Sequence, residues 1–200
     1  VSPNLGSDRE IIFAADYLHP LSKAVTAEGG AKAIFRNVFS DIFYDTLDLA
    51  SQQYLRDLSR NNTFDYDQNV AAAYGQISFP ITAQLKARAG LRYEHTFIDG
   101  LTQSDGNQFE NDYASWVPSG LLAWTLPDRS TLKFSYNRRI QRPSMYFLNP
   151  YVNYNDPTNI SYGNPELKPE VTESLELSYG FAKGTANGTF SICHKATSDL

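Results

Sequence analysis

Only one of the 200 residues is a cysteine, so a disulfide framework and a cysteine-rich metal site are excluded. The chain also has no apolar stretch near the roughly 20 residues that a membrane-spanning helix requires. Basic residues are outnumbered, with 17 Lys and Arg against 22 Asp and Glu and a net charge of -5. Because nucleic-acid-binding proteins present a basic surface, this balance argues against nucleic acid as a partner.

Motifs for catalysis are missing as well. There is no glycine-rich phosphate loop and no G-x-S-x-G nucleophile elbow. His194 follows Cys193 directly, so on a strand their side chains point to opposite faces. Asp41, Asp45 and Asp48 fall in a polar segment without the spacing of an EF-hand. We therefore expect no catalytic, cofactor-binding or metal-binding residues, and no enzyme.

What the chain does have is aromatic residues, at 14%, in a sequence whose mean hydropathy is only -0.41. Apolar and polar residues alternate with a period of two, which is the pattern of a β-strand with two different faces. Helical periodicity is confined to residues 48–60, where a helical turn or two could form within a loop. Eight strands are expected, over residues 11–17, 25–36, 66–79, 85–98, 113–126, 131–140, 174–181 and 189–195.

Charged residues gather on one face of these expected strands. The members of that face are Glu28, Lys32, Arg36, Lys86, Arg88, Arg92, Lys133 and Arg139. In a membrane barrel they would line a hydrated lumen while the apolar face meets lipid, and the average over both faces would look hydrophilic. On a one-sided soluble sheet the same face would meet bulk water.

The connections between the strands alternate in length. The short, turn-rich links are residues 19–22, 80–82, 127–130 and 183–187. The long polar links are about 40–65, 99–112 and 141–170. Transmembrane β-barrels have short periplasmic turns and longer extracellular loops, and their strands need about 9–11 residues. The pattern therefore favours an antiparallel transmembrane β-barrel.

Trp116 and Trp124 share one face of their expected strand. At about 3.3 Å per residue they are roughly 26 Å apart along the strand, which projects to about 20 Å at a tilt of about 40°. This is close to the spacing of two aromatic girdles around an apolar band of about 25 Å. A pair of ordinary core tryptophans would satisfy the same spacing.

The segment after residue 134 carries an ordered set of motifs. They are Arg138-Arg139-Ile140-Gln141-Arg142-Pro143, Leu148-Asn149-Pro150, Asp156-Pro157, Gly163-Asn164-Pro165-Glu166-Leu167-Lys168-Pro169-Glu170 and Ser174-Leu175-Glu176-Leu177-Ser178-Tyr179. In this order they resemble the C-terminal barrel region of the outer-membrane β-barrel family related to TonB-dependent receptors, of the type common in Bacteroidetes. Weaker similarities at 71–74 and 89–94 extend the resemblance over most of the chain from about residue 65.

The resemblance implies a barrel of about 22 strands in the outer membrane of a Gram-negative bacterium, with an N-terminal plug. It also implies the partners: outer-membrane lipid, the plug, an inner-membrane energy-coupling protein and, as a further candidate, a surface lipoprotein. Residues 1–200 begin with Val1 and contain no plug or energy-coupling box. We therefore expect them to be an arc of one barrel domain, about eight strands of a larger barrel that takes up a nutrient.

Two alternatives remain open from the sequence. One is a soluble all-β carbohydrate-binding module that uses tyrosines of the long loops. The other is a small outer-membrane barrel without transport, since eight strands can close a barrel. Upstream sequence separates the second from a transporter, because only a transporter needs a plug domain.

The link 141–170 holds five of the ten prolines, which keep it out of a strand ladder and give it a fixed shape. It also carries several aromatic residues. The candidates for ligand contact among them are Tyr146, Tyr151, Tyr154 and Tyr162. The same aromatic residues, with Phe147, could instead pack the loop against the barrel mouth, and this is the interpretation that the composition favours.

Overall fold

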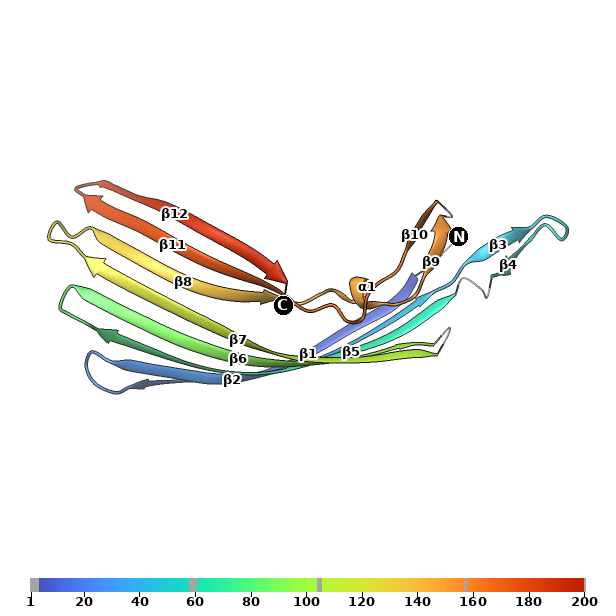
Figure 1. The fold of residues 1–200 in the computed structure, drawn as a ribbon, viewed down its shortest axis with the longest axis horizontal. Coiled ribbons are helices and arrows are strands. Elements are labelled where there is room, and N and C mark those ends of the chain that lie inside the picture. The colour runs from blue at the N-terminus through green and yellow to red at the C-terminus, as the bar shows by residue number, and fades with distance from the viewer. Residues whose placement is uncertain (1–3, 58–60, 104–105, 157, 200) are drawn as a thin grey trace.

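The computed structural model describes residues 4–57, 61–103, 106–156 and 158–199, with side chains except at 4, 153–156, 159 and 199. Eight long strands form one antiparallel sheet in chain order (Figure 1). They are β1 (Asn4–Pro20), β2 (Thr26–Ile42), β5 (Asn62–Pro80), β6 (Leu85–Thr102), β7 (Asn107–Thr125), β8 (Thr131–Gln141), β11 (Glu170–Lys183) and β12 (Ala186–Asp199). The expected eight-stranded antiparallel sheet is confirmed.

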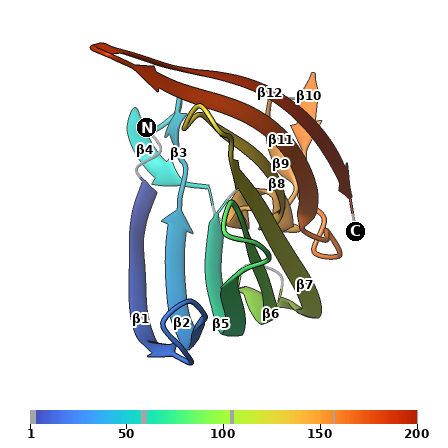
Figure 2. The same ribbon diagram turned by 90° about the vertical axis from the view of Figure 1, so that its left-hand side faces the viewer.

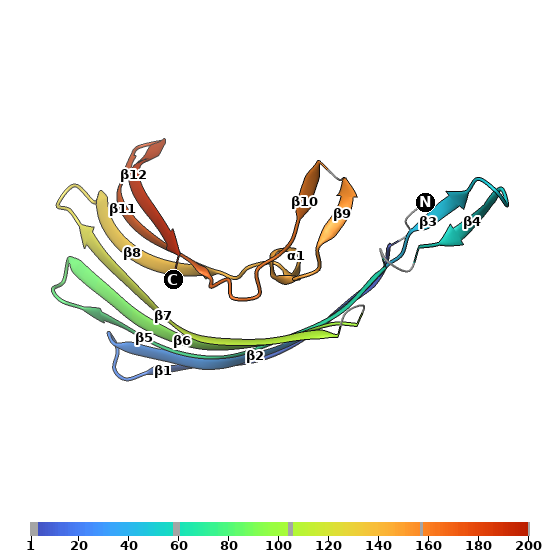
Figure 3. The same cartoon turned by 45° about the vertical axis from the view of Figure 1, so that its right-hand side comes forward.

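The sheet is an open arc. Within the described residues, β1 and β12 are its two edges and do not pair with each other. Figures 2 and 3 show the strands curving round a hollow, so the sheet has a convex and a concave face. Such an arc is the wall of a barrel that needs further strands to close, because each edge exposes unpaired backbone groups.

Short turns join the strands at one end of the arc, which we call the turn end. Side-chain oxygens stabilise them: Ser22 Oγ accepts from the Val25 amide at 3.1 Å, and Thr82 Oγ1 accepts from the Leu85 amide at 3.0 Å. At the third turn, hydrogen bonds from the Ser130 hydroxyl and amide lower the pKa of Asp128. These local bonds let each hairpin close without a long connection.

The strands extend further toward the opposite end, the loop end, than the alternation predicts. The expected loop at 99–112 is mostly strand, because β6 runs to Thr102 and β7 begins at Asn107. Here the polar residues move to the other face: Asp67 of β5 lies opposite Asp99 of β6 on the convex side, whereas the neighbouring Tyr66 and Ile98 are buried on the concave side. Backbone pairing therefore continues past the point where the apolar residues change from the convex to the concave face.

The remaining elements lie beyond the strand ends at the loop end. A hairpin of β3 (Asp45–Asp48) and β4 (Gln53–Arg56) replaces the helical turns expected at 48–60, of which 58–60 are outside the described residues. Asp48 makes this turn by accepting from the Ala50 and Ser51 amides and the Ser51 hydroxyl, and these bonds lower its pKa.

Between β8 and β11 lie α1 (Met145–Leu148), β9 (Asn153–Asp156) and β10 (Asn159–Ser161), on the concave side of the sheet (Figure 3). No helix of the described residues is long and apolar enough to cross a membrane.

The core sits on the concave face near the loop end. It consists of Val38, Phe64, Tyr66, Ile98 and Leu148, with Phe109, Tyr113, Met145 and Leu167 packed against it. α1 lies on the concave side, so the strand residues that pack against its Leu148 point to the concave face. Side chains two positions apart along a strand lie on the same face. The register then places all eight residues of the predicted charged face on the concave side.

The convex face carries the apolar and aromatic half of the alternation. Trp116 and Trp124 both lie there, 56% and 49% exposed, and the Trp116 ring is 4.8 Å from that of Tyr93. His95, also on this face, contacts Phe97 and places Nε2 3.1 Å from Asp112 Oδ2. Exposed aromatic and apolar side chains on this face, between the turn end and the polar residues Asp67 and Asp99, are what a lipid-facing barrel wall requires.

Candidate functional site

The connection 142–169 turns back over the concave face instead of standing away from the barrel wall (Figures 1 and 3). Its apolar anchor is Leu148, which is 0% exposed and packs between side chains of β2, β5 and β6. Pro169, just before β11, is also fully buried. Full burial of a Leu side chain stabilises by about 1.5–3 kcal/mol, so this contact alone favours the folded-in loop.

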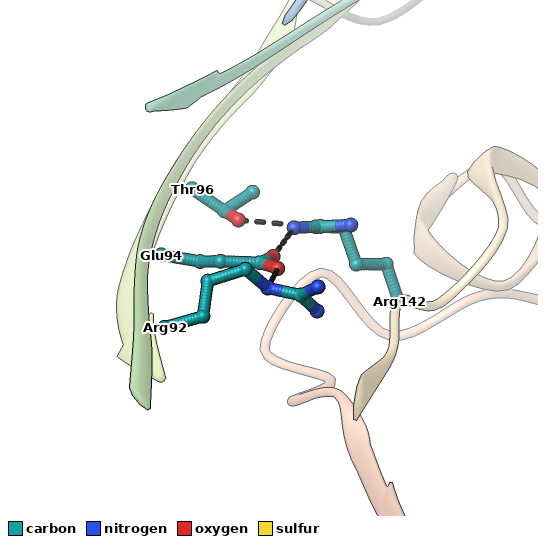
Figure 4. Close-up of polar contacts among 4 residues, drawn as sticks. All are labelled: Arg92, Glu94, Thr96 and Arg142. Carbon is teal, nitrogen blue, oxygen red and sulfur yellow. Dashed lines mark hydrogen bonds and ion pairs between the residues drawn. The ribbon is translucent and has the colours of Figure 1, made fainter. Parts of the chain in front are cut away.

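A polar cluster fastens the start of the same loop to β6 (Figure 4). Glu94 is the centre: its Oε1 lies 2.6 Å from Arg92 Nε and its Oε2 contacts Arg142 Nη2. Arg142 Nε also donates to Thr96 Oγ1 at 3.1 Å. The Glu94 side chain is only 8% exposed, and a carboxylate so deeply buried requires charged partners. The cluster therefore ties Arg142, the first loop residue, to the wall.

The end of the loop has its own polar attachment. Asn111 of β7 donates its Nδ2 to the carbonyl oxygens of Pro165 and Leu167, at 3.1 and 3.4 Å. Because proline lacks an N–H, this segment does not join the strand ladder, and its carbonyl groups remain available to a side-chain amide of the wall. Both ends of the loop are thus attached to the concave face.

The two arms of the loop are also bound to each other. The Gly163 amide donates to Asn149 O at 2.9 Å, and the Asn164 amide donates to Phe147 O at 2.7 Å. A Cβ on Gly163 would lie 2.5 Å from Asn149 O and 2.6 Å from Phe147 O, closer than any side chain tolerates. Glycine is therefore required where the Gly-Asn-Pro motif crosses the end of α1.

A pocket of about 210 Å³, the loop-end pocket, lies between this loop and the ends of β2 and β5. Its lining comprises Ser40, Ile42, Tyr44, Asn62, Met145, Tyr146, Phe147, Asn149, Tyr151, Ser161, Tyr162 and Gly163. The lining combines aromatic rings with amide and hydroxyl groups and includes no charged side chain. Such a surface can stack on a ring and hydrogen-bond to a neutral polar ligand.

A second cavity, of about 570 Å³, lies on the other side of Phe147. It is lined in part by Arg142, Glu166, Lys168 and Glu170, so its two positive and two negative charges cancel. The two cavities share Phe147 as a common wall. The loop therefore creates a neutral and a mixed-charge compartment side by side at the mouth of the barrel.

The structure gathers three of the four predicted tyrosines, Tyr146, Tyr151 and Tyr162, around the loop-end pocket. The side chain of Tyr154 lies outside the described residues. Tyr146 and Tyr162 do not pack the loop against the mouth, because they are 68% and 74% exposed, and Leu148 makes the fully buried contact. Contact with a ligand remains a prediction.

Sequence reasoning missed the residues that come from distant parts of the chain. Ser40, Tyr44 and Asn62 line the loop-end pocket although they flank another loop, and Glu94 and Asn111 fasten a loop that starts about 30–50 residues later. No local motif marks them. The alternation places Glu94 on the polar face of its strand, but only the tertiary structure brings it beside Arg142. Within the described residues no group of three or more metal-ligating side chains occurs.

Comparison with known proteins is consistent with this geometry. The outer membrane protein beta-barrel family matches residues 2–200. Among solved structures the chain is similar to the copper transporter OprC, with a TM-score of 0.73 and 15% identity over 100% of this chain and 32% of that one. It is also similar to the ferric yersiniabactin uptake receptor FyuA from Yersinia pestis, with a TM-score of 0.64 and 15% identity over 100% of this chain and 30% of that one.

A third similar structure is the ferric citrate transporter FecA in its unliganded form, with a TM-score of 0.63 and 15% identity over 96% of this chain and 27% of that one. The chain thus spans about a third of the length of these structures. No curated protein sequence matches it. The family match and the barrel-wall geometry together identify the chain as a member of the outer membrane protein beta-barrel family, forming part of a barrel in the outer membrane of a Gram-negative bacterium.

Proposed function

We propose that the protein containing this chain takes up a nutrient across the outer membrane through a plugged barrel. The observation that carries the proposal is the loop 142–169, folded over the concave face and fastened there by Arg142, Leu148 and Asn111. A loop held inside the mouth narrows the opening and presents binding groups to the outside. This arrangement suits a selective transporter better than an open pore.

The open arc supports a large barrel over a small one. Eight strands suffice for a small closed barrel, yet these eight end in two unpaired edges. Similar structures named as transporters or uptake receptors contain the same arc as about a third of their length. The small non-transporting barrel is therefore the second candidate.

The partners follow from the two faces. The convex face, with exposed Trp116 and Trp124, contacts outer-membrane lipid. The charged concave face, which includes Lys32, Arg88 and Lys133, surrounds a plug domain supplied by the rest of the protein. An inner-membrane energy-coupling protein acts on that plug, and a surface lipoprotein covering the mouth is a further candidate. Tyr146, Tyr151, Tyr154 and Tyr162 contact the ligand as it enters.

The test compares two gene deletions across a panel of defined nutrient sources. We expect that deleting the full-length gene and deleting the energy-coupling protein impair growth on the same nutrient when it is scarce. The full-length protein should also migrate faster on a gel before heating than after, as folded outer-membrane barrels do. A growth defect that needs the barrel but not the coupling protein would contradict energised uptake. A folded barrel whose deletion impairs growth on no nutrient would favour the non-transporting alternative.

A further inference from the structure

Three basic side chains on the concave face near the turn end have no counter-charge. Lys86 and Arg88 come from β6 and Lys133 from β8, and all three are exposed. Among the described residues none of the three forms an ion pair, and Arg88 only donates its Nε to Ser78 Oγ, at 3.1 Å. We call these three residues the basic patch.

Strand β7 lies between the two lysines and adds no charge there. Lys86 and Lys133 both lie opposite Ala123 of β7, so two strand spacings put them about 10 Å apart. The carboxylate next to them in the register is Glu176 of β11, which is diagonal to Lys133 and forms no ion pair with it. The basic patch therefore carries three positive charges beside one carboxylate.

The first strands of the arc carry the opposite charge. The Tyr74 hydroxyl lies 2.6 Å from Asp16 Oδ1 of β1 and 3.1 Å from Glu28 Oε1 of β2. The tyrosine and Asp16 meet over Gly30, where a Cβ would collide with both. Lys32 is diagonal to Asp16 in the register but does not pair with it. A neutral phenol leaves carboxylates charged, so Asp16 and Glu28, the acidic pair, also lack a counter-charge.

The proposed plug fills the lumen and therefore displaces water from the basic patch and the acidic pair. A charge that loses its water without gaining a partner is strongly unfavourable. Carboxylates opposite the basic patch, and a cationic group opposite the acidic pair, remove that penalty. The charges of the wall thus specify the charges of the surface that docks against it.

The distance between the two charged places fits a folded domain better than a small anion. Asp16 on β1 and Lys133 on β8 are five strand spacings apart, about 24 Å along the wall at about 4.8 Å each. A domain of about 100 residues has a radius of gyration of about 13 Å, so it can contact both places at once. A small anion that passes through the barrel contacts only one.

We infer that the basic patch and the acidic pair form a two-part docking surface for the plug domain, which presents carboxylates to β6–β8 and a cationic group to β1–β2. The inference deepens the proposed function, on which it rests, by naming the chemistry of the partner. Opposite charges at two separate places also fix the rotation of the plug within the barrel, because turning the plug would bring like charges together.

The test uses the full-length protein in planar lipid bilayers, with urea added to release the plug. The measured quantity is the urea concentration at which half of the channels conduct. Lys86→Glu/Lys133→Glu should lower this concentration by about 1 M or more, because like charges then face each other. The matched control is Lys23→Glu/Lys183→Glu, which makes the same change of charge at exposed lysines of the turn end outside the patch and should have no effect.

A milder variant covers the case in which the reversed one does not fold, as judged by heat-modifiable migration. Lys86→Gln/Lys133→Gln removes the charges without adding opposite ones, so it should lower the opening concentration by a smaller amount. Asp16→Asn/Glu28→Gln tests the acidic pair and should lower the opening concentration as well.

A suppressor selection identifies the partner surface. Cells that carry Lys86→Glu/Lys133→Glu should admit a large antibiotic that the outer membrane normally excludes. Substitutions in the plug that restore exclusion should replace Asp or Glu by a neutral or basic residue. Suppressors that never alter an acidic residue of the plug would contradict the inference.

Two further results would overturn it. In one, Lys86→Glu/Lys133→Glu opens at the same urea concentration as the control. In the other, the plug stays in place and only the uptake of an anionic nutrient is lost, which would assign the basic patch to a passing anion. Failure of the proposed function looks different: channels of the unsubstituted protein would conduct without urea, because no plug closes the barrel.

Discussion

Two connections leave the loop end of the same sheet and take opposite courses. The hairpin β3–β4 extends away from the barrel, with Leu49 and Tyr54 78% and 64% exposed. The loop 142–169 folds inward and buries Leu148 completely. Both segments contain apolar residues, so composition does not separate them. The difference is that the wall offers the second segment matching partners, whereas Arg56 of the hairpin contacts its own immediate neighbours, Asp45 and Phe43.

The comparison teaches that a few long-range contacts decide where a long loop lies. Glu94, Thr96 and Asn111 all project from strands onto the concave face, where they meet loop groups from residues 142–167. Removing these contacts should release the loop 142–169 from the concave face, so that it extends away from the barrel as the hairpin does. The amides of Gly163 and Asn164, which bind Asn149 O and Phe147 O, are suitable reporters of loop opening by hydrogen exchange in the full-length protein.

The largest effect is expected for Leu148→Ala. Truncating a fully buried leucine costs about 2–5 kcal/mol, because it loses transfer free energy and leaves a cavity. Here the cost falls on the loop, so the Gly163 and Asn164 amides should exchange far faster while the barrel still shows heat-modifiable migration. Leu49→Ala in the exposed hairpin is the control and should change neither the exchange of these amides nor the gel migration. Unchanged exchange in Leu148→Ala would show that the apolar contact does not hold the loop.

Glu94→Gln comes next. The substitution keeps the shape but replaces charge-assisted hydrogen bonds to Arg92 and Arg142, and hydrogen bonds to charged groups are worth about 1.5–3 kcal/mol. We expect the opening free energy of the loop to fall by about 2 kcal/mol, seen again in the exchange of the two reporter amides. Glu166→Gln, an exposed carboxylate of the same loop, should leave exchange unchanged. A loss as large in Glu166→Gln would contradict the role of the buried cluster.

Gly163→Ala sharpens the comparison within the loop itself. The added methyl group would lie 2.5 Å from Asn149 O and must push the two arms apart. Overpacking of this kind costs about 1–3 kcal/mol. Limited proteolysis should cut residues 142–169 of the full-length Gly163→Ala variant sooner than the same residues of the unsubstituted protein. Gly184→Ala, in a turn where a Cβ has open space but φ is +60°, tests strain without the clash and should not expose this loop.

The smallest effect is expected in the hairpin. Arg56 pairs with Asp45 at 3.4 Å and stacks 3.7 Å over the Phe43 ring, but its side chain is 48% exposed. Exposed ion pairs contribute about 0–1 kcal/mol. Arg56→Ala should therefore speed exchange of the Asp57 amide, which binds Tyr44 O, by less than tenfold and leave the loop 142–169 untouched. A change in the Gly163 amide would show that the two connections are coupled.

Much of the barrel wall could be predicted because the relevant signal is local. Alternation along residues 85–98 correctly separates Arg88 and Arg92 from Leu91 and Tyr93, since neighbouring side chains on a strand must point to opposite faces. The same rule missed the strand ends where polar residues take over the convex face, as at Asp67 and Asp99, so the strands proved longer than predicted. It also failed at 48–60, where side-chain bonds from Asp48 favour a turn over a helix.

Less of the candidate site could be predicted. The proline-rich loop and its tyrosines were visible, but their partners were not. Asn62 and Glu94 carry no motif of their own, and each becomes informative only through what register and curvature place beside it. The packing role assigned to Tyr146 and Tyr162 failed for the same reason: which side of a loop faces the wall depends on the residues of the wall.

The sequence by itself determined the two faces of the sheet, the short turns and the proline-stiffened loop, because side-chain alternation and proline geometry act within a few residues. The tertiary structure alone decided that the loop folds inward, that Glu94 binds Arg142 and that Asn62 shares a pocket with Tyr146, Tyr151 and Tyr162. These outcomes depend on contacts between segments tens of residues apart, and such contacts exist only once the strands have paired in register and the sheet has curved.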